Sequence, residues 1–456
     1  MTLEDVRRRL PVVSELPPSR GRGFIPGKGP NASTPRLAVW EFTLACDQHC
    51  LHCGPRAGKR RPDELSTEEA LALVRDLADV GVGEVVLIGG EAYLRHDFIL
   101  VIREIRRLGM TATMTTGGYN LTRARARAMV EAGIQSVSLS IDGLQPSHDR
   151  VRNTKDSWTR AFAALRHLRE AGCKVATNTQ INVWTRHELL PLLELLAAEG
   201  IHAWQLQITV PHGHAADHPE MILQPYMYPE LFETLDQVVD RCEARGITVW
   251  PANSLGYFGP YEFKLRRRQR PRTGHYSGCE AGASTMGIEA NGAIKNCPSL
   301  GTEVNIGGSW REHGVATLWR EAREMTSLRN RSVDDLWGFC RTCYYGPTCM
   351  GGCTAVSEPV LGRPGNNPFC IHRALELGKQ GLRERIELVR KAPPVGFGTP
   401  LFRVVREAID PERRAREGIV ATEEPRVSRL EAWEGPGWEV ERTVESPAAE
   451  PPTAGS

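Results

Sequence analysis

Six short β-rich segments alternate with helical segments between residues 37 and 211, and this alternation is the strongest constraint on the fold. Ser66 with Glu69, and Thr185 with Glu188, have the spacing of helix capping boxes. Strand and helix units in series, joined by short loops, predict a parallel sheet with right-handed crossovers, either open or curled towards a barrel. Ligands of such α/β folds bind at the carboxyl ends of the strands. The expected strands are Leu37–Thr43, Glu84–Gly89, Thr111–Thr116, Ser136–Asp142, Lys174–Asn182 and Ala203–Val210, and the expected helix-ending glycines are Gly109, Gly133, Gly172 and Gly200.

The composition is that of a folded globular protein. The 456 residues suggest two to three domains or one large barrel with appendages. The net charge of +2 is too small to attract nucleic acid or an anionic membrane, so neither is an expected partner. No secretory signal is readable, and the most apolar stretch, residues 189–198, is too short to span a bilayer. We therefore expect a cytoplasmic protein whose clustered cysteines are metal ligands or catalytic groups rather than disulfides.

Three of the 12 cysteines follow the first expected strand, as Cys46, Cys50 and Cys53 in a C-x3-C-x2-C pattern. Three thiolates cannot complete a tetrahedral structural zinc site alone. They can bind three irons of a 4Fe–4S cluster and leave the fourth iron for an exogenous ligand. A zinc site or a redox thiol is the alternative interpretation.

Two further motifs follow strands in the same stretch: Gly89-Gly90-Glu91 after the second, and Ser140 with Asp142 at the end of the fourth. Together with the cysteine loop they resemble the radical S-adenosylmethionine (radical SAM) superfamily. The resemblance implies a partial (β/α)6 TIM-like barrel and a 4Fe–4S cluster whose free iron is chelated by SAM. One electron from that cluster breaks the sulfonium bond, and a 5′-deoxyadenosyl radical then abstracts hydrogen from a substrate.

The resemblance also implies contacts for SAM. Gly89, Gly90 and Glu91 would bind its ammonium group, Ser140 and Asp142 its ribose, and Arg152 its carboxylate. His52 stands before the third cysteine, where the family usually has an aromatic residue near the adenine, so that contact departs from the family pattern. No catalytic acid or base is identified.

Seven more cysteines lie between residues 279 and 370, and their spacing alone allows a zinc knuckle. The pattern resembles the SPASM extension of radical SAM enzymes, which implies two auxiliary 4Fe–4S clusters. One implied ligand set is Cys340, Cys343, Cys349 and Cys370, and the other is Cys279, Cys297 and Cys353. The second set leaves one iron open or bound by another residue such as His275. We expect the remaining two cysteines, Cys173 and Cys242, to be buried structural thiols.

Other polar residues are candidates for substrate binding. Six cations, Lys264, Arg266, Arg267, Arg268, Arg270 and Arg272, form either a solvated loop or a dock for an acidic peptide or leader. His212, His214 and His218 follow the sixth strand and are either polar loop residues or take part in substrate binding or proton transfer. Tyr119, Asn178 and Gln180 stand at the same end of the sheet.

The sequence divides into five expected parts. They are an N-terminal extension (1–35), a radical SAM core (36–255), a basic bridging segment (256–274), a SPASM domain (275–390) and a Pro/Glu-rich, loosely ordered tail (391–456).

The motifs look most like those of maturases of ribosomally made peptides. The expected function is therefore a crosslink, thioether, oxidation or excision on a precursor peptide or protein. The alternatives are a radical SAM dehydrogenase of a sugar or aminoglycoside, and a non-catalytic iron–sulfur or zinc protein. An electron donor such as a flavodoxin or ferredoxin is an implied partner. The N-terminal extension is too short for a winged-helix leader-recognition domain, so leader capture would need the basic bridging segment, the SPASM region or a separate leader-recognition protein.

Overall fold

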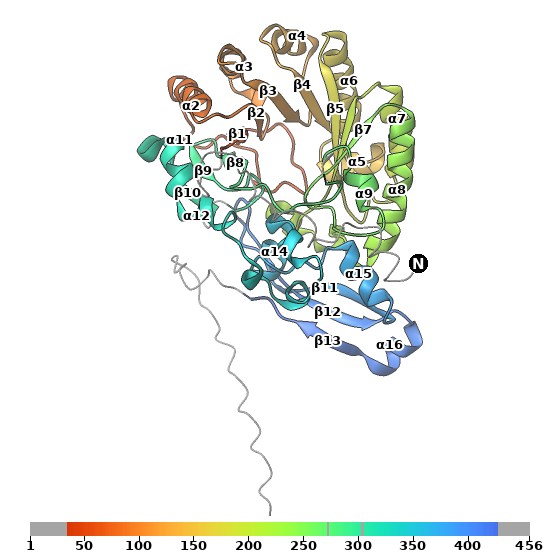
Figure 1. Cartoon of the computed structure of the whole chain (residues 1–456). Helices are drawn as coiled ribbons and strands as arrows, with labels where there is room; N and C mark the ends of the chain where they lie inside the picture. Colours follow the sequence, from red (N-terminus) through yellow and green to blue (C-terminus); the bar gives the residue numbers. More distant parts are fainter. Residues whose placement is uncertain (1–33, 271–272, 302–304, 427–456) are drawn as a thin grey trace, which may run out of the picture.

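The computed structural model describes residues 34–270, 273–301 and 305–426, and its main feature is a ten-stranded sheet that curves around a central space (Figure 1). The strand order is β10-β9-β8-β1-β2-β3-β4-β5-β6-β7. All neighbouring strands from β8 to β7 are parallel, whereas β9 and β10 are antiparallel additions. The strands are β1 (Leu37–Thr43), β2 (Glu84–Gly89), β3 (Thr111–Thr116), β4 (Ser136–Ser140), β5 (Lys174–Ile181), β6 (Ala203–Ile208), β7 (Thr248–Pro251), β8 (Thr285–Ile288), β9 (Ala293–Lys295) and β10 (Ile306–Ser309).

Helices cover the outer face of this sheet (Figure 1). Ser66 and Glu69 form the expected capping box at the start of α2, and the four expected glycines end helices with positive φ. The second expected capping box is wrong, because α7 begins at Leu189 and Glu188 instead binds Leu144 N and Ser147 Oγ. The helices are α2 (Thr67–Asp79), α3 (Phe98–Arg107), α4 (Arg123–Glu131), α5 (Gln145–Arg152), α6 (Ser157–Glu170), α7 (Leu189–Ala198) and α8 (Tyr228–Ala244).

The partial barrel is confirmed, and the sheet does not close, because its outermost strands are β10 and β7. Two parallel strands beyond the six expected ones, β7 and β8, extend it on either side. Since β8 pairs with β1, the cysteine-rich part of the chain continues the barrel sheet directly. Its helices are short: α9 (Glu262–Arg266), α11 (Trp310–Glu321), α12 (Arg323–Ser327), α13 (Gly346–Cys349), α14 (Thr354–Leu361) and α15 (Ile371–Gly378).

A second, three-stranded antiparallel sheet has two of its strands, β12 and β13, where a loosely ordered tail (391–456) was expected. It consists of β11 (Leu382–Arg390), β12 (Leu401–Ala408) and β13 (Ile419–Glu423), with α16 (Pro411–Glu417) before the last strand. The expected boundary at residue 390 separates β11 from its partner β12. The proline enrichment and the Glu, Pro and Ala content of residues 391–456 favoured a tail. In the structure, charged residues of β12 pair with β11, as in Arg406 with Glu384 and Arg403 with Glu387. Residues 1–33 and 427–456 lie outside the described residues.

None of the helices within the described ranges has the length and apolarity needed to cross a membrane.

Candidate active site and cysteine sets

The first three cysteines lie on the loop after β1, here called the cysteine loop (residues 44–58). The loop closes on itself, because Cys46 N donates to Gly58 O (3.1 Å) and Gly58 N donates to Leu44 O (2.9 Å). The turn after β2 packs against its start, where Gly90 N donates to Thr43 O (2.7 Å). A Cβ on Gly90 would lie 2.1 Å from Ala45 O, so only glycine allows this approach. The sequence therefore brings the Gly89-Gly90-Glu91 turn and the cysteines into one site.

Glu91 is buried in this site. Its carboxylate accepts hydrogen bonds from Thr116 Oγ1 and from Gly117 N (2.6 Å). Burial, with a further contribution from the nearby Asp47, raises the pKa of this carboxyl to about 8. A cationic group beside Glu91 would favour the ionised form, so the position suits a ligand with positive charge.

Asp142 joins the end of β4 to α5 and to the cysteine loop. Its Oδ2 lies 2.9 Å from His52 Nε2 and 2.8 Å from Arg152 Nε, and its Oδ1 accepts from Gln180 N (3.0 Å). Burial alone would raise the pKa of Asp142, but Arg152 and His52 hold it below its usual value. Arg152 Nη1 also lies 3.6 Å from Cys50 Sγ. The structure thus brings Arg152 and Asp142 to the cysteines.

Three other predicted pocket residues have different surroundings. Ser140 Oγ donates to Asn178 Oδ1 (3.2 Å), so these two predicted residues are partners. The guanidinium of Arg160 stacks over the Tyr119 ring at 4.4 Å. Tyr119 is not among the described residues that line the cavity of Cys279, Cys297 and Cys353.

The loop after β6 packs on the cysteine loop. His214 N donates to Cys53 O (2.9 Å), and His214 Nδ1 lies 3.1 Å from Cys50 O. Arg56, three residues after Cys53, forms two hydrogen bonds with Asp217 (2.7 and 2.8 Å). His218 instead faces Glu220 at 3.4 Å. His212 lines the same cavity as His52 and Gly54 of the cysteine loop, so two of the three predicted histidines, His212 and His214, reach the site. Arg56 and Asp217 also lie here, but no motif in the sequence identified them.

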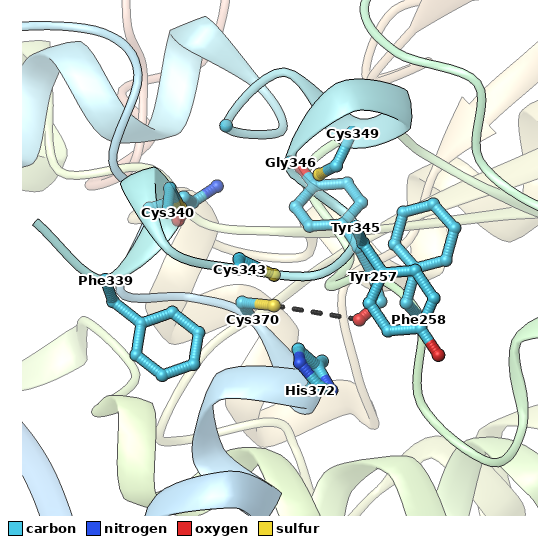
Figure 2. A pocket seen from close by; sticks show the side chains of 12 residues that line it. Tyr257, Phe258, Phe339, Cys340, Cys343, Tyr345, Gly346, Cys349, Cys370 and His372 are labelled. Atoms are coloured by element: carbon cyan, nitrogen blue, oxygen red, sulfur yellow. Dashed lines mark hydrogen bonds between the residues drawn. The ribbon is translucent and has the colours of Figure 1, made fainter. Parts of the chain in front are cut away.

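Four of the later cysteines line one small cavity, here called the four-cysteine set: Cys340, Cys343, Cys349 and Cys370 (Figure 2). Aromatic side chains surround them, and the Cys370 thiol donates to Tyr257 O (3.6 Å). Burial raises the pKa of Cys349, and the thiols of the other three raise it further.

The remaining three, Cys279, Cys297 and Cys353, here called the three-cysteine set, line a different cavity. Burial raises the pKa of Cys353, and Cys279 and Cys297 raise it further. The ring of His275 lies 5.8 Å from that of Phe258, which lines the four-cysteine cavity. His275 itself is not among the described lining residues of either cavity, so its role as a ligand of the three-cysteine set stays a prediction. Iron binding by either set stays a prediction.

The cavity of the three-cysteine set, here called the central cavity, has a volume of about 400 Å³ and reaches the cysteine loop. Its lining includes His52, Gly54 and Gly89 together with the three cysteines. The amide side chains of Gln180, Gln205, Gln207 and Asn253 line it as well. One cavity thus connects the predicted SAM end of the barrel with the three-cysteine set.

The described cations of the basic bridging segment pair with carboxylates of the chain. Lys264 pairs with Asp236 and Asp240, both on α8. Arg267 and Arg268 pair with Glu243, also on α8 (2.6 and 3.3 Å). Arg266 pairs with Glu262, and Arg270 with Glu280, while Arg272 lies outside the described residues. Docking of an acidic peptide on this segment stays a prediction.

The two cysteines outside these sets are buried, as expected: Cys173 is 8% exposed and Cys242, on α8, is 0% exposed.

The fold and the cysteine loop are those of a known enzyme class. The radical SAM superfamily model matches residues 40–196. The chain is 25% identical over 355 residues to the AdoMet-dependent heme synthase of Nitratidesulfovibrio vulgaris, covering 75% of this chain and 93% of that protein. It is 28% identical over 349 residues to the mycofactocin maturase MftC of Mycolicibacterium smegmatis, covering 74% and 83%. Its fold is similar to that of Streptococcus suis SuiB bound to the precursor peptide SuiA, with a TM-score of 0.54, 18% identity and coverage of 70% and 72%.

Residues 40–196 form a radical SAM domain, and the chain is an enzyme. Its relatives include SPASM-type peptide maturases, among which is the mycofactocin maturase. The radical SAM domain implies a 4Fe–4S cluster and SAM.

Proposed function

We propose that this enzyme uses SAM to modify a ribosomally made precursor peptide within the central cavity. Cys46, Cys50 and Cys53 would hold the cluster that binds SAM. When bound, cluster and SAM supply a carbon radical able to take a hydrogen atom from the substrate. The central cavity carries the proposal, because it lies between the cysteine loop and the three-cysteine set and offers the substrate a site between them.

The residues around the cysteine loop fit the charges of SAM. The ammonium would lie at the Gly89-Gly90-Glu91 turn, where the buried Glu91 carboxyl gains a cationic neighbour. Arg152 would pair with the SAM carboxylate. Ser140 and Asp142 would meet the ribose, although the Asp142 oxygens already bind His52, Arg152 and Gln180. Among the described residues Asp142 Oδ1 accepts from Gln180 N alone, so it can also accept from a ribose hydroxyl.

The seven later cysteines would hold two auxiliary clusters. The four-cysteine set supplies a full set of ligands for one 4Fe–4S cluster. The three-cysteine set leaves one iron for another ligand, and its cavity is the one that receives the substrate. The proposal also includes an electron donor such as a flavodoxin or ferredoxin, because each SAM cleavage consumes an electron. A separate leader-recognition protein remains part of it too.

The lining of the central cavity favours a peptide over a porphyrin. Glutamine and asparagine side chains both donate and accept hydrogen bonds, as a peptide backbone requires. Porphyrin carboxylates would instead need free cations. Among the described lining residues the only lysine or arginine is Lys295, and its Nζ already pairs with Glu289 (3.1 Å). The maturase relative and the peptide complex of SuiB support the same choice.

Replacing Cys46, Cys50 and Cys53 with alanine tests the proposal. We expect loss of 5′-deoxyadenosine formation under reducing, anaerobic conditions, with Cys173→Ala as the matched buried-thiol control that retains it. Normal formation in the triple variant would refute the mechanism. Mass spectrometry of a short peptide encoded beside the gene and co-expressed with the enzyme identifies the modification, and an unmodified peptide would count against a peptide substrate.

A further inference from the structure

The loop between β11 and β12, residues 391–400, lies against the cysteine loop. Phe397 N donates to Gly54 O (2.7 Å), directly after Cys53. Arg56 Nε donates to Val395 O (3.1 Å) across 339 positions of sequence. Gly213 N, in the loop after β6, donates to Gly398 O (2.9 Å). Backbone hydrogen bonds from two separate loops of the barrel therefore fix this part of the chain.

The loop brings one aromatic side chain into the central cavity. Phe397 is 7% exposed and lines the cavity together with Cys297 and His52. Lys295 Nζ lies 4.2 Å from the centre of its ring, and the His212 ring meets it edge-on at 5.5 Å. The ring is thus held from the barrel side and from the strand that precedes Cys297.

The local backbone is adapted to this placement. Phe397 has φ of 55°, a left-handed conformation that non-glycine residues seldom adopt and that is frequent at functional sites. A Cβ on Gly54 would lie 3.3 Å from Phe397 Cε1 and 3.0 Å from His212 Nε2, so glycine at this position leaves room for both rings. A loop that only connected two strands would not require these close contacts.

We infer that Phe397 sets the size of the substrate group that fits between the cysteine loop and the three-cysteine set. This inference rests on the proposed function and makes Phe397 a specificity-determining residue. Its ring occupies cavity volume and offers an apolar surface, so the group beside it is a carbon side chain of limited size. Removing the ring would enlarge the space at this point and admit larger groups.

Two deuterated alcohols of different size, 2-propanol and cyclohexanol, test this without the natural substrate. In peptide-free enzyme with its clusters, SAM and a one-electron reductant such as dithionite, one electron cleaves SAM, and a carbon-bound deuterium of the alcohol then forms the new C–D bond in 5′-deoxyadenosine. The carbon radical left on the alcohol takes up a second electron from the reductant and a proton from water. Mass spectrometry gives the deuterated fraction for each alcohol. For Phe397→Ala we expect the ratio of cyclohexanol-derived to 2-propanol-derived deuterium to rise about tenfold or more. Phe397→Trp should lower this ratio.

Val395→Ala is the matched control, because this residue lies on the same loop with its side chain 52% exposed. Its ratio should equal that of the unmodified enzyme. An unchanged ratio in Phe397→Ala would overturn the inference. Should the alanine variant fail to fold, Phe397→Leu serves instead, with a smaller increase expected. Absence of 5′-deoxyadenosine from the unmodified enzyme would contradict the proposed function, a result distinct from an unchanged ratio.

A second measurement needs neither cluster nor SAM. In the purified full-length chain before cluster assembly, the rates at which iodoacetamide and the larger pyrenyl maleimide modify Cys297 and Cys353 report access to the cavity. Phe397→Ala should increase the rate for the larger reagent relative to the smaller one, with buried Cys242 as internal reference. Equal rate ratios in the variant and the unmodified chain would also overturn the inference.

Discussion

At the scale of the residue, left-handed backbone gathers around the cysteines. Arg56 follows Cys53, Met350 follows Cys349, Phe258 lines the four-cysteine cavity and Phe397 the central one, and all four have φ between 53° and 56°. Each such conformation costs about 1–3 kcal/mol and persists only where the surroundings enforce it. For Arg56 the enforcing contacts are Asp217, Gly213 O and Val395 O. The protein therefore shapes the cysteine loops through their neighbours as well as through any metal.

Gly90→Ala should disturb this arrangement directly. The new Cβ would lie 2.1 Å from Ala45 O, a backbone atom that cannot move without shifting the cysteine loop. We expect a loss of about 1–3 kcal/mol in the free energy of unfolding, as for other overpacking substitutions. Urea denaturation followed by circular dichroism measures it. Gly58→Ala on the same loop is the control, because its Cβ meets nothing within 4 Å. Equal stability of the two variants would contradict the proposed close packing.

At the scale of the element, α9 joins the barrel to the cysteine-rich part through buried charge. Arg266 and Glu262 are nearly inaccessible, and Arg266 Nη2 also donates to Leu255 O (2.8 Å). Glu262 accepts from Phe258 N (3.2 Å) and Tyr276 N (2.6 Å), which fixes the chain on both sides of the helix. Arg267 and Arg268 pair with Glu243 of α8 at the surface, where an ion pair contributes little.

The two kinds of pair predict losses of different size for the neighbouring Arg266 and Arg267. Arg266→Met leaves the Glu262 carboxylate buried without its cation, and we expect it to lower the free energy of unfolding by about 3–5 kcal/mol. Arg267→Met removes a partly exposed partner of Glu243 and should cost less than about 1 kcal/mol. Thermal unfolding of both variants under the same conditions measures the difference. Similar losses would mean that α9 does not depend on this buried pair.

At the scale of the whole molecule, the sequence predicted what depends on local spacing. The first three strands have their expected bounds, and the cysteine loop and the Gly89-Gly90-Glu91 turn meet because consecutive parallel strands end at one edge. The sequence did not predict the contacts between segments that are distant along the chain. The partners of Lys264 and Arg267 lie on α8, and Phe397 reaches Gly54 from a stretch whose charge and proline content are typical of a tail. These segments are ordered because they form contacts with residues distant in sequence. The residue types within a segment do not identify such partners.

The separation of the cysteine sets predicts how iron is distributed over the molecule. Among the described residues, the four-cysteine cavity and the central cavity have no lining residue in common, so each set can lose its metal without direct loss of the other. Three complete 4Fe–4S clusters would give about 12 irons per chain. Cys340→Ala with Cys343→Ala should leave about eight and preserve 5′-deoxyadenosine formation. Replacing Cys46, Cys50 and Cys53 should also leave about eight, but without that product.

Iron and zinc analysis of the anaerobically reconstituted variants, with Cys173→Ala as the control, distinguishes these cases. The two sets of variants have equal iron in this prediction and differ only in SAM cleavage, because only the cysteine loop lies beside Glu91 and Arg152. About four irons per chain in the unmodified enzyme would mean that the two auxiliary 4Fe–4S clusters are absent. Zinc in place of iron at the seven later cysteines would show that this part of the chain has a structural metal site. Only the cluster of the cysteine loop would then take part in redox chemistry.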